Sequence, residues 1–168
     1  MKTDDKIPIL LIGIGNEFRK DDGVGLVVAR KIAAKNIRKV AVMEYSGEGT
    51  SLMEAWRHAQ TVILVDAIAS GGQAGTIHHF EAHRENIPAN FFNYSTHAFS
   101  VAEAVELSRA LGKLPEIVHV YGIEGEDFAA GAGLSVSVEN KIEKLTEQIM
   151  QEITILLIRN HLIKLSPV

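Results

Sequence analysis

Residues 13–25 decide the fold and read Gly13-Ile-Gly-Asn-Glu-Phe-Arg-Lys-Asp21-Asp22-Gly-Val-Gly25. The preceding run, residues 9–12, is wholly apolar, as expected for a strand buried on both faces of a parallel sheet. After the glycines, apolar residues recur at the spacing of a helix face, at Val24, Val27, Val28 and Ile32. The stretch therefore predicts a strand, a tight glycine turn and a helix that begins beside two adjacent carboxylates.

The same alternation continues along the chain. Strands are predicted at residues 40–43, 61–65, 76–80 and 117–121, and helices at about 52–59, 98–111 and from 138 onward. The turn cluster at 70–75 is too short for a parallel crossover, so the strand after it is predicted to be an antiparallel edge strand. The fold class is therefore α/β, a doubly wound, mostly parallel five-stranded sheet flanked by helices, in one domain spanning residues 1–168.

Composition narrows the function classes. The chain has 168 residues, 46% hydrophobic and 23% charged, as in ordinary globular proteins. Its formal net charge of −4 argues against nucleic-acid or anionic-membrane partners. There are no cysteines, so disulfides and thiolate metal sites are excluded. Neither a signal peptide nor an apolar run long enough to cross a membrane is apparent, and we expect a cytoplasmic protein without membrane insertion.

Several polar residues follow predicted parallel strands, at the edge of the sheet where such folds usually bind ligands. Asp22 follows the first strand, Asp66 ends the third, and the glycine-rich acidic loop 122–133 follows the fifth. These positions share the carboxyl edge of the sheet, which is the usual binding edge of such folds. His97 stands just before another predicted helix. Two carboxylates and an imidazole that converge there would form a metal site or an acid–base site.

Each of these residues also has a purely structural interpretation. One of Asp21 and Asp22 is expected to cap the helix, and Asp66 can accept hydrogen bonds from the loop that follows it. His97 can be part of a helix start capped by Ser95 or Thr96. A cluster of His78, His79, His83 and Glu81 is interpreted as part of a solvated edge strand rather than as a metal site.

Several familiar motifs are absent. The third glycine of a dinucleotide-binding fingerprint would fall at position 18, which is Phe. The sequence contains no Gly-x-Ser-x-Gly, no cysteine nucleophile and no His-Glu-x-x-His, which removes the common protease classes.

In its ordered set of motifs the chain resembles the hydrogenase maturation proteases. The resemblance covers most of the chain: the stretch 13–25, Val65-Asp66-Ala67, Ser95-Thr-His97, Tyr121-Gly-Ile-Glu124 and Gly133-Leu-Ser-Val-Ser-Val138. It implies a twisted five-stranded, phosphorylase/hydrolase-like sheet. It also implies an endopeptidase that removes the C-terminal extension of the nickel–iron hydrogenase large-subunit precursor.

The resemblance further implies that nickel is carried by the precursor and that the protein holds no cofactor of its own tightly. Asp22, Asp66 and His97 then complete the coordination of that nickel and serve catalysis. The first ligand in the family is Glu or Asp, which favours Asp22 over Asp21. Residues expected to contact the substrate are Asn16, Asp21, Gly49, Thr50 and Glu124.

The chain departs from the family pattern in two loops. Residues 44–50 lack the common Asp-Gly-Gly-Thr form, and residues 122–126 lack a proline often found there. Both loops are expected to read the substrate, so the departures bear on which hydrogenase is processed.

Several alternatives remain open. The metal either polarises the scissile carbonyl or activates water, or it only docks the tail while Asp22 or Asp66 acts as general base. A non-catalytic, metal-dependent assembly factor would use the same three ligands. A hydrolase resembling peptidyl-tRNA hydrolases, which also open with a Gly-x-Gly-Asn turn, is disfavoured by the acidic balance.

Overall fold

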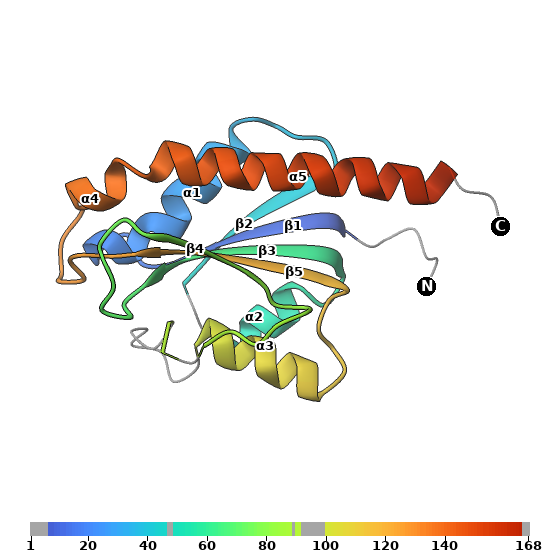
Figure 1. Cartoon of the computed structure of the whole chain (residues 1–168), viewed down its shortest axis with the longest axis horizontal. Helices are drawn as coiled ribbons and strands as arrows, with labels where there is room; N and C mark the ends of the chain where they lie inside the picture. Colours follow the sequence, from blue (N-terminus) through green and yellow to red (C-terminus); the bar gives the residue numbers. More distant parts are fainter. Residues whose placement is uncertain (1–6, 47–48, 89, 92–99, 166–168) are drawn as a thin grey trace.

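The apolar runs of the sequence form a five-stranded sheet in the computed structural model of the chain, which describes residues 7–46, 49–88, 90–91 and 100–165 (Figure 1). The strand order is β2-β1-β3-β5-β4. Only β4 is antiparallel, and it lies at an edge, so the predicted fold class is confirmed. The strands are β1 (Ile7–Ile14), β2 (Val40–Tyr45), β3 (Ala59–Ile68), β4 (Ile77–Glu81) and β5 (Ile117–Glu124).

Helices cover both faces of this sheet (Figure 1). Side chains alternate between the two faces along β1: Ile9 and Leu11 pack into one core, while Leu10 and Ile12 pack into the other. The first core lies under α1 (Val24–Ala33), α4 (Val136–Glu139) and α5 (Ile142–Leu165), and the second lies under α2 (Gly49–Ala55) and α3 (Val101–Ala110).

The strand bounds differ from the predicted ones by up to three residues, and three helix boundaries also differ. The helix expected from residue 98 begins at Val101, because Ser100 and Glu103 form a reciprocal capping box. The helix expected over 52–59 ends at Ala55, since a turn after it lets Ala59 start β3. The single closing helix is divided into α4 and α5, with a turn between them in which the Lys141 N–H donates to the Val138 carbonyl.

A short 3-10 helix, η1 (Lys20–Gly23), lies between β1 and α1. Within the described part of the chain, no helix has the length and apolar character needed to cross a membrane.

Candidate functional site

The candidate site lies where the strand order reverses. From β1 the chain passes to β2 on one side, and then to β3 on the other. A crevice at the carboxyl ends of strands is the usual binding place in an open α/β sheet at such a point. Asp22 belongs to η1 directly after β1, and Asp66 lies near the end of β3, beside Gly122 of β5. The fold therefore brings the two predicted carboxylates to the same point.

Glycines allow α1 to begin against the strand ends. A Cβ on Gly25 would lie 2.2 Å from the Ile14 carbonyl oxygen and 2.3 Å from that of Val65. Gly15 has a φ of +150°, and a Cβ there would lie 1.8 Å from the Asp22 carbonyl oxygen. Only residues without a side chain fit at these contacts, and their close packing places η1 beside the end of β3.

Asp66 is the electrostatically unusual member of the site. Its residue exposure is only 9%, and one carboxylate oxygen accepts a 2.8 Å hydrogen bond from the Ala67 N–H. Burial raises the pKa of Asp66 well above its usual range, and the charge of Asp22 raises it further, opposed by the Ala67 N–H. Two carboxylates placed this way favour either a shared proton or a bound cation. Asp22 itself is half-buried.

The neighbouring Asp21 has an entirely different environment. It is fully buried, and its oxygens accept hydrogen bonds from the N–H groups of Glu126, Asp127 and Ser135, at 2.8, 2.9 and 2.7 Å. The Ser135 hydroxyl donates a fourth, at 2.8 Å. Asp21 thus connects η1 to the loop after β5. These contacts are internal, and the substrate contact expected of Asp21 stays a prediction.

Two other predicted substrate-binding residues also make internal contacts. The Asn16 side-chain oxygen accepts from the Phe18 N–H at 2.9 Å, which closes the turn before η1. Glu124 is buried and accepts from the backbone N–H and the hydroxyl of Ser70. Gly49 and Thr50 are the first residues of α2. The substrate contacts of these residues remain predictions.

The predicted imidazole ligand, His97, lies outside the described residues, as do Ser95 and Thr96. The described helix that follows is α3, whose cap is Ser100. Within the described ranges, no three His, Asp or Glu side chains are grouped so that they could hold a metal ion. The three-ligand site that includes His97 therefore stays a prediction.

A separate polar group, which we call the histidine cluster, comprises His79, His83, His119 and Glu152. His79 Nε2 lies 2.8 Å from His119 Nδ1, and His119 Nε2 lies 3.4 Å from a Glu152 carboxylate oxygen. The rings of His83 and His119 are 5.6 Å apart. Burial, with smaller effects from His79 and His83, lowers the pKa of His119 to about 4. His119 is therefore neutral near pH 7.

The sequence interpretation did not single out His119. The available signal was a histidine in the middle of an otherwise apolar strand, Ile117-Val-His119-Val-Tyr121. The edge strand that carries His79 was predicted, and His79 is exposed on it.

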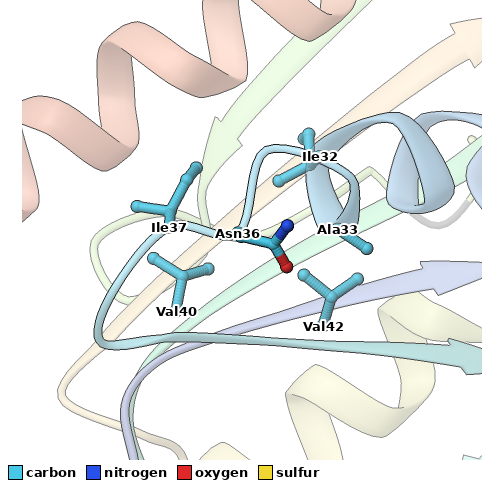
Figure 2. Close-up of a pocket in the computed structure, with 6 residues that line it drawn as sticks. All are labelled: Ile32, Ala33, Asn36, Ile37, Val40 and Val42. Carbon is cyan, nitrogen blue, oxygen red and sulfur yellow. The ribbon is translucent and has the colours of Figure 1, made fainter.

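A pocket lined mostly by aliphatic side chains lies at the other end of α1, away from the carboxylates. Figure 2 shows its lining, which is aliphatic except for one amide. It offers neither acid–base groups nor metal ligands, so it does not compete with the carboxyl edge as a catalytic site. The lining residues are Ile32, Ala33, Asn36, Ile37, Val40 and Val42.

Comparisons with known proteins agree with the fold and with the resemblance to the hydrogenase maturation proteases. A sequence model of a family described as hydrogenase maturation protease (HycI) matches residues 26–152. The hydrogenase 2 maturation protease of Escherichia coli K12 is 27% identical over 146 residues, covering 84% of this chain and 88% of the relative. A putative hydrogenase maturation protease of Methanocaldococcus jannaschii is 31% identical over 154 residues, covering 88% of this chain and 97% of the relative.

Solved structures show the same likeness. The hydrogenase maturating endopeptidase HybD from E. coli superposes with a TM-score of 0.74 at 25% identity, covering 88% of this chain and 92% of that one. The maturation protease HycI from Thermococcus kodakarensis KOD1 gives a TM-score of 0.64 at 22% identity, covering 88% and 93%. The second likeness bears on the fold alone.

Proposed function

This chain belongs to the hydrogenase maturation protease family, and we propose that it removes the C-terminal extension of a nickel–iron hydrogenase large-subunit precursor after nickel has been inserted. The family consists of endopeptidases of hydrogenase maturation, which sets this chain among peptidases rather than peptidyl-tRNA hydrolases or non-catalytic assembly factors.

The observation that carries the proposal is the placement of Asp66, buried beside Asp22, at the switch point of the sheet. A fold gains nothing from burying Asp66 beside a second carboxylate that raises its pKa further, whereas a cation brought by a substrate would stabilise both charges. We assign Asp22 and Asp66 as ligands to the precursor's nickel, with His97 as the third.

Oxygen and imidazole ligands leave the metal's remaining positions to the substrate. Two carboxylates and one imidazole do not close a coordination sphere, and they bind nickel less selectively than thiolates do. A chain without cysteine therefore holds the metal only while the precursor presents it. Such a site senses whether nickel has been inserted and releases it with the product.

The hydrolysis step needs an activated water and a polarised carbonyl. A metal in this position supplies Lewis-acid chemistry at the scissile bond. Where the metal only docks the tail, Asp22 or Asp66 takes up the proton of the attacking water as general base.

The test is the intact mass of a large-subunit precursor incubated with this protein, with and without loaded nickel. Loss of a C-terminal peptide only from the nickel-loaded sample is the expected result. Cleavage of both samples would support the peptidase activity but contradict its dependence on nickel. No mass change with any cognate precursor would overturn the proposed substrate.

A further inference from the structure

Phe18 is the most exposed large apolar side chain in the described part of the chain, at 72% of its full accessibility. It lies on the turn between β1 and η1, four residues before Asp22. The fold does not use its ring for packing: Phe18 belongs to neither of the two hydrophobic cores. A single exposed aromatic is unremarkable in itself, so its surroundings decide its meaning.

The backbone at Phe18 is held on both sides. Its N–H donates to the Asn16 side-chain oxygen at 2.9 Å, and its carbonyl accepts from the Gly131 N–H at 2.9 Å. The Lys20 N–H donates to the Gly131 carbonyl at 3.0 Å, and Arg19 forms a parallel bridge with Gly131. The ring is thus displayed on a braced turn, so its exposure does not come from a fraying segment.

The segment beside this turn is also exposed and carries no charge. Residues 129–133 read Ala-Ala-Gly-Ala-Gly, and all five are exposed. The charges that flank the patch all have partners within the protein. Glu17 forms a salt bridge with Arg30, Lys20 forms one with Asp127, and the Arg19 guanidinium donates to the Phe128 carbonyl. Phe18 and residues 129–133 therefore form an uncharged rim, held together by the hydrogen bonds to Gly131.

This rim borders the carboxylate pair. Asp22 donates its N–H to the Arg19 carbonyl at 3.1 Å, so the turn that displays Phe18 also positions Asp22. Because Phe18 lies four residues before Asp22 on this turn, a polypeptide bound at Asp22 can also reach the rim. Interfaces place aromatic side chains in uncharged centres and keep charges at their margins, and the rim has that arrangement.

We propose that Phe18 is a substrate-contact residue, the apolar anchor by which the protein docks the precursor beside the bond to be cut. The inference rests on the proposed function and adds the chemistry of the partner surface: uncharged and apolar, on the body of the precursor next to its C-terminal extension. Phe18 supplies binding, while the carboxylates supply the chemistry.

The test compares Phe18→Ser, Phe18→Leu and Leu111→Ser with the unchanged protein. Leu111 is 54% exposed at the end of α3, on the connection that leads to the opposite end of β5, and it serves as the matched control. Three quantities are measured with nickel-loaded precursor: the dissociation constant of the complex, and KM and kcat for removal of the extension. Thermal unfolding of each variant confirms that the fold is intact.

We expect Phe18→Ser to raise the dissociation constant and KM by about tenfold, the loss typical of an interface anchor, with little change in kcat. Phe18→Leu retains most of the affinity, and Leu111→Ser changes neither constant. Unchanged binding and KM in Phe18→Ser would overturn the anchor while leaving the protease function in place. A third outcome is that the unchanged protein binds the precursor without cleaving it, and that Phe18→Ser no longer binds it. This result would support the anchor but overturn the proposed reaction. No binding by the unchanged protein would overturn both.

Discussion

Two groups of titratable side chains occupy this fold, and they are built on opposite principles. At the carboxyl edge, burial raises the pKa of Asp66, and the neighbouring carboxylate of Asp22 raises it further. In the histidine cluster, burial keeps His119 neutral, and both of its ring nitrogens face polar partners, His79 and Glu152. The two carboxylates need a proton or a cation to offset their charges, whereas the polar atoms of the His119 ring already have partners within the protein. We infer that the first is the chemical centre and that the second is structural.

Replacing Asp22 tests the chemical half of the comparison and carries the largest expected effect. Asp22→Asn keeps the size of the side chain but removes a ligand charge, so precursor cleavage should fall by roughly 10²- to 10⁴-fold. Asp22→Glu keeps the charge and should retain measurable cleavage. Rates are measured by intact mass of nickel-loaded precursor. Full activity of Asp22→Asn would remove this residue from the site.

The close packing that brings the carboxylates together can be broken at Gly25. Gly25→Ala places a methyl group against two carbonyl oxygens, at 2.2 and 2.3 Å, so we expect a loss of about 3 kcal/mol or more in the free energy of unfolding. Gly112→Ala is the control, because nothing lies within 4 Å of its Cβ position. Its positive φ costs about 1–2 kcal/mol. Urea unfolding distinguishes the two, and equal losses would contradict the packing argument.

Asp21 separates structure from chemistry within the same motif. Asp21→Ala leaves three backbone N–H groups and a hydroxyl without their acceptor, which should cost about 2–4 kcal/mol of stability. Activity should fall with it, since η1 also carries Asp22. Denaturation midpoints and cleavage rates are measured together. A stable Asp21→Ala protein with a raised KM alone would instead support direct contact with the substrate.

The histidine cluster predicts a pH dependence of stability. Because the folded pKa of His119, about 4, lies below the unfolded value of about 6.5, the unfolded chain binds an extra proton between these limits. The free energy of unfolding should therefore fall by about 1–3 kcal/mol as pH drops from 7 to 4, and this part should vanish in His119→Gln. The charged or titratable groups facing His119 are His79, Glu81, His83, Arg84 and Glu152.

The comparison of unfolding curves isolates His119 from carboxylates that titrate in the same range. Denaturant unfolding of both proteins is recorded at matched pH values. If stability depends on pH in the same way in His119→Gln and in the unchanged protein, the pKa of His119 is not lowered by folding, and the prediction is wrong.

The sheet could be predicted because β1 and β3 contain continuous apolar runs ended by glycine or aspartate, and because the connection before β4 is too short for a parallel crossover. Asp22 and Asp66 could be predicted to meet because parallel strands share a carboxyl edge. Both predictions need only the order of strands and connections along the chain, which can be read directly from the sequence.

The remaining features depend on contacts between distant segments. Which of Asp21 and Asp22 faces the site is decided by Ser135 and the loop after β5, more than 100 residues away. His119 is partnered by His79 on another strand and by Glu152 on α5, so periodicity carries no sign of it. The division between α4 and α5, by contrast, comes from a local turn that the helical spacing of the apolar residues does not reveal.

The most direct test of the account is a time course of intact precursor mass with the unchanged protein, Asp66→Asn and His119→Gln, at pH 7 with nickel-loaded precursor. The account predicts that the unchanged protein and His119→Gln remove the C-terminal extension at similar rates, while Asp66→Asn leaves the precursor whole. Cleavage by Asp66→Asn at the unchanged rate, or loss of cleavage in a folded His119→Gln, would contradict the assignment of chemistry to the carboxyl edge.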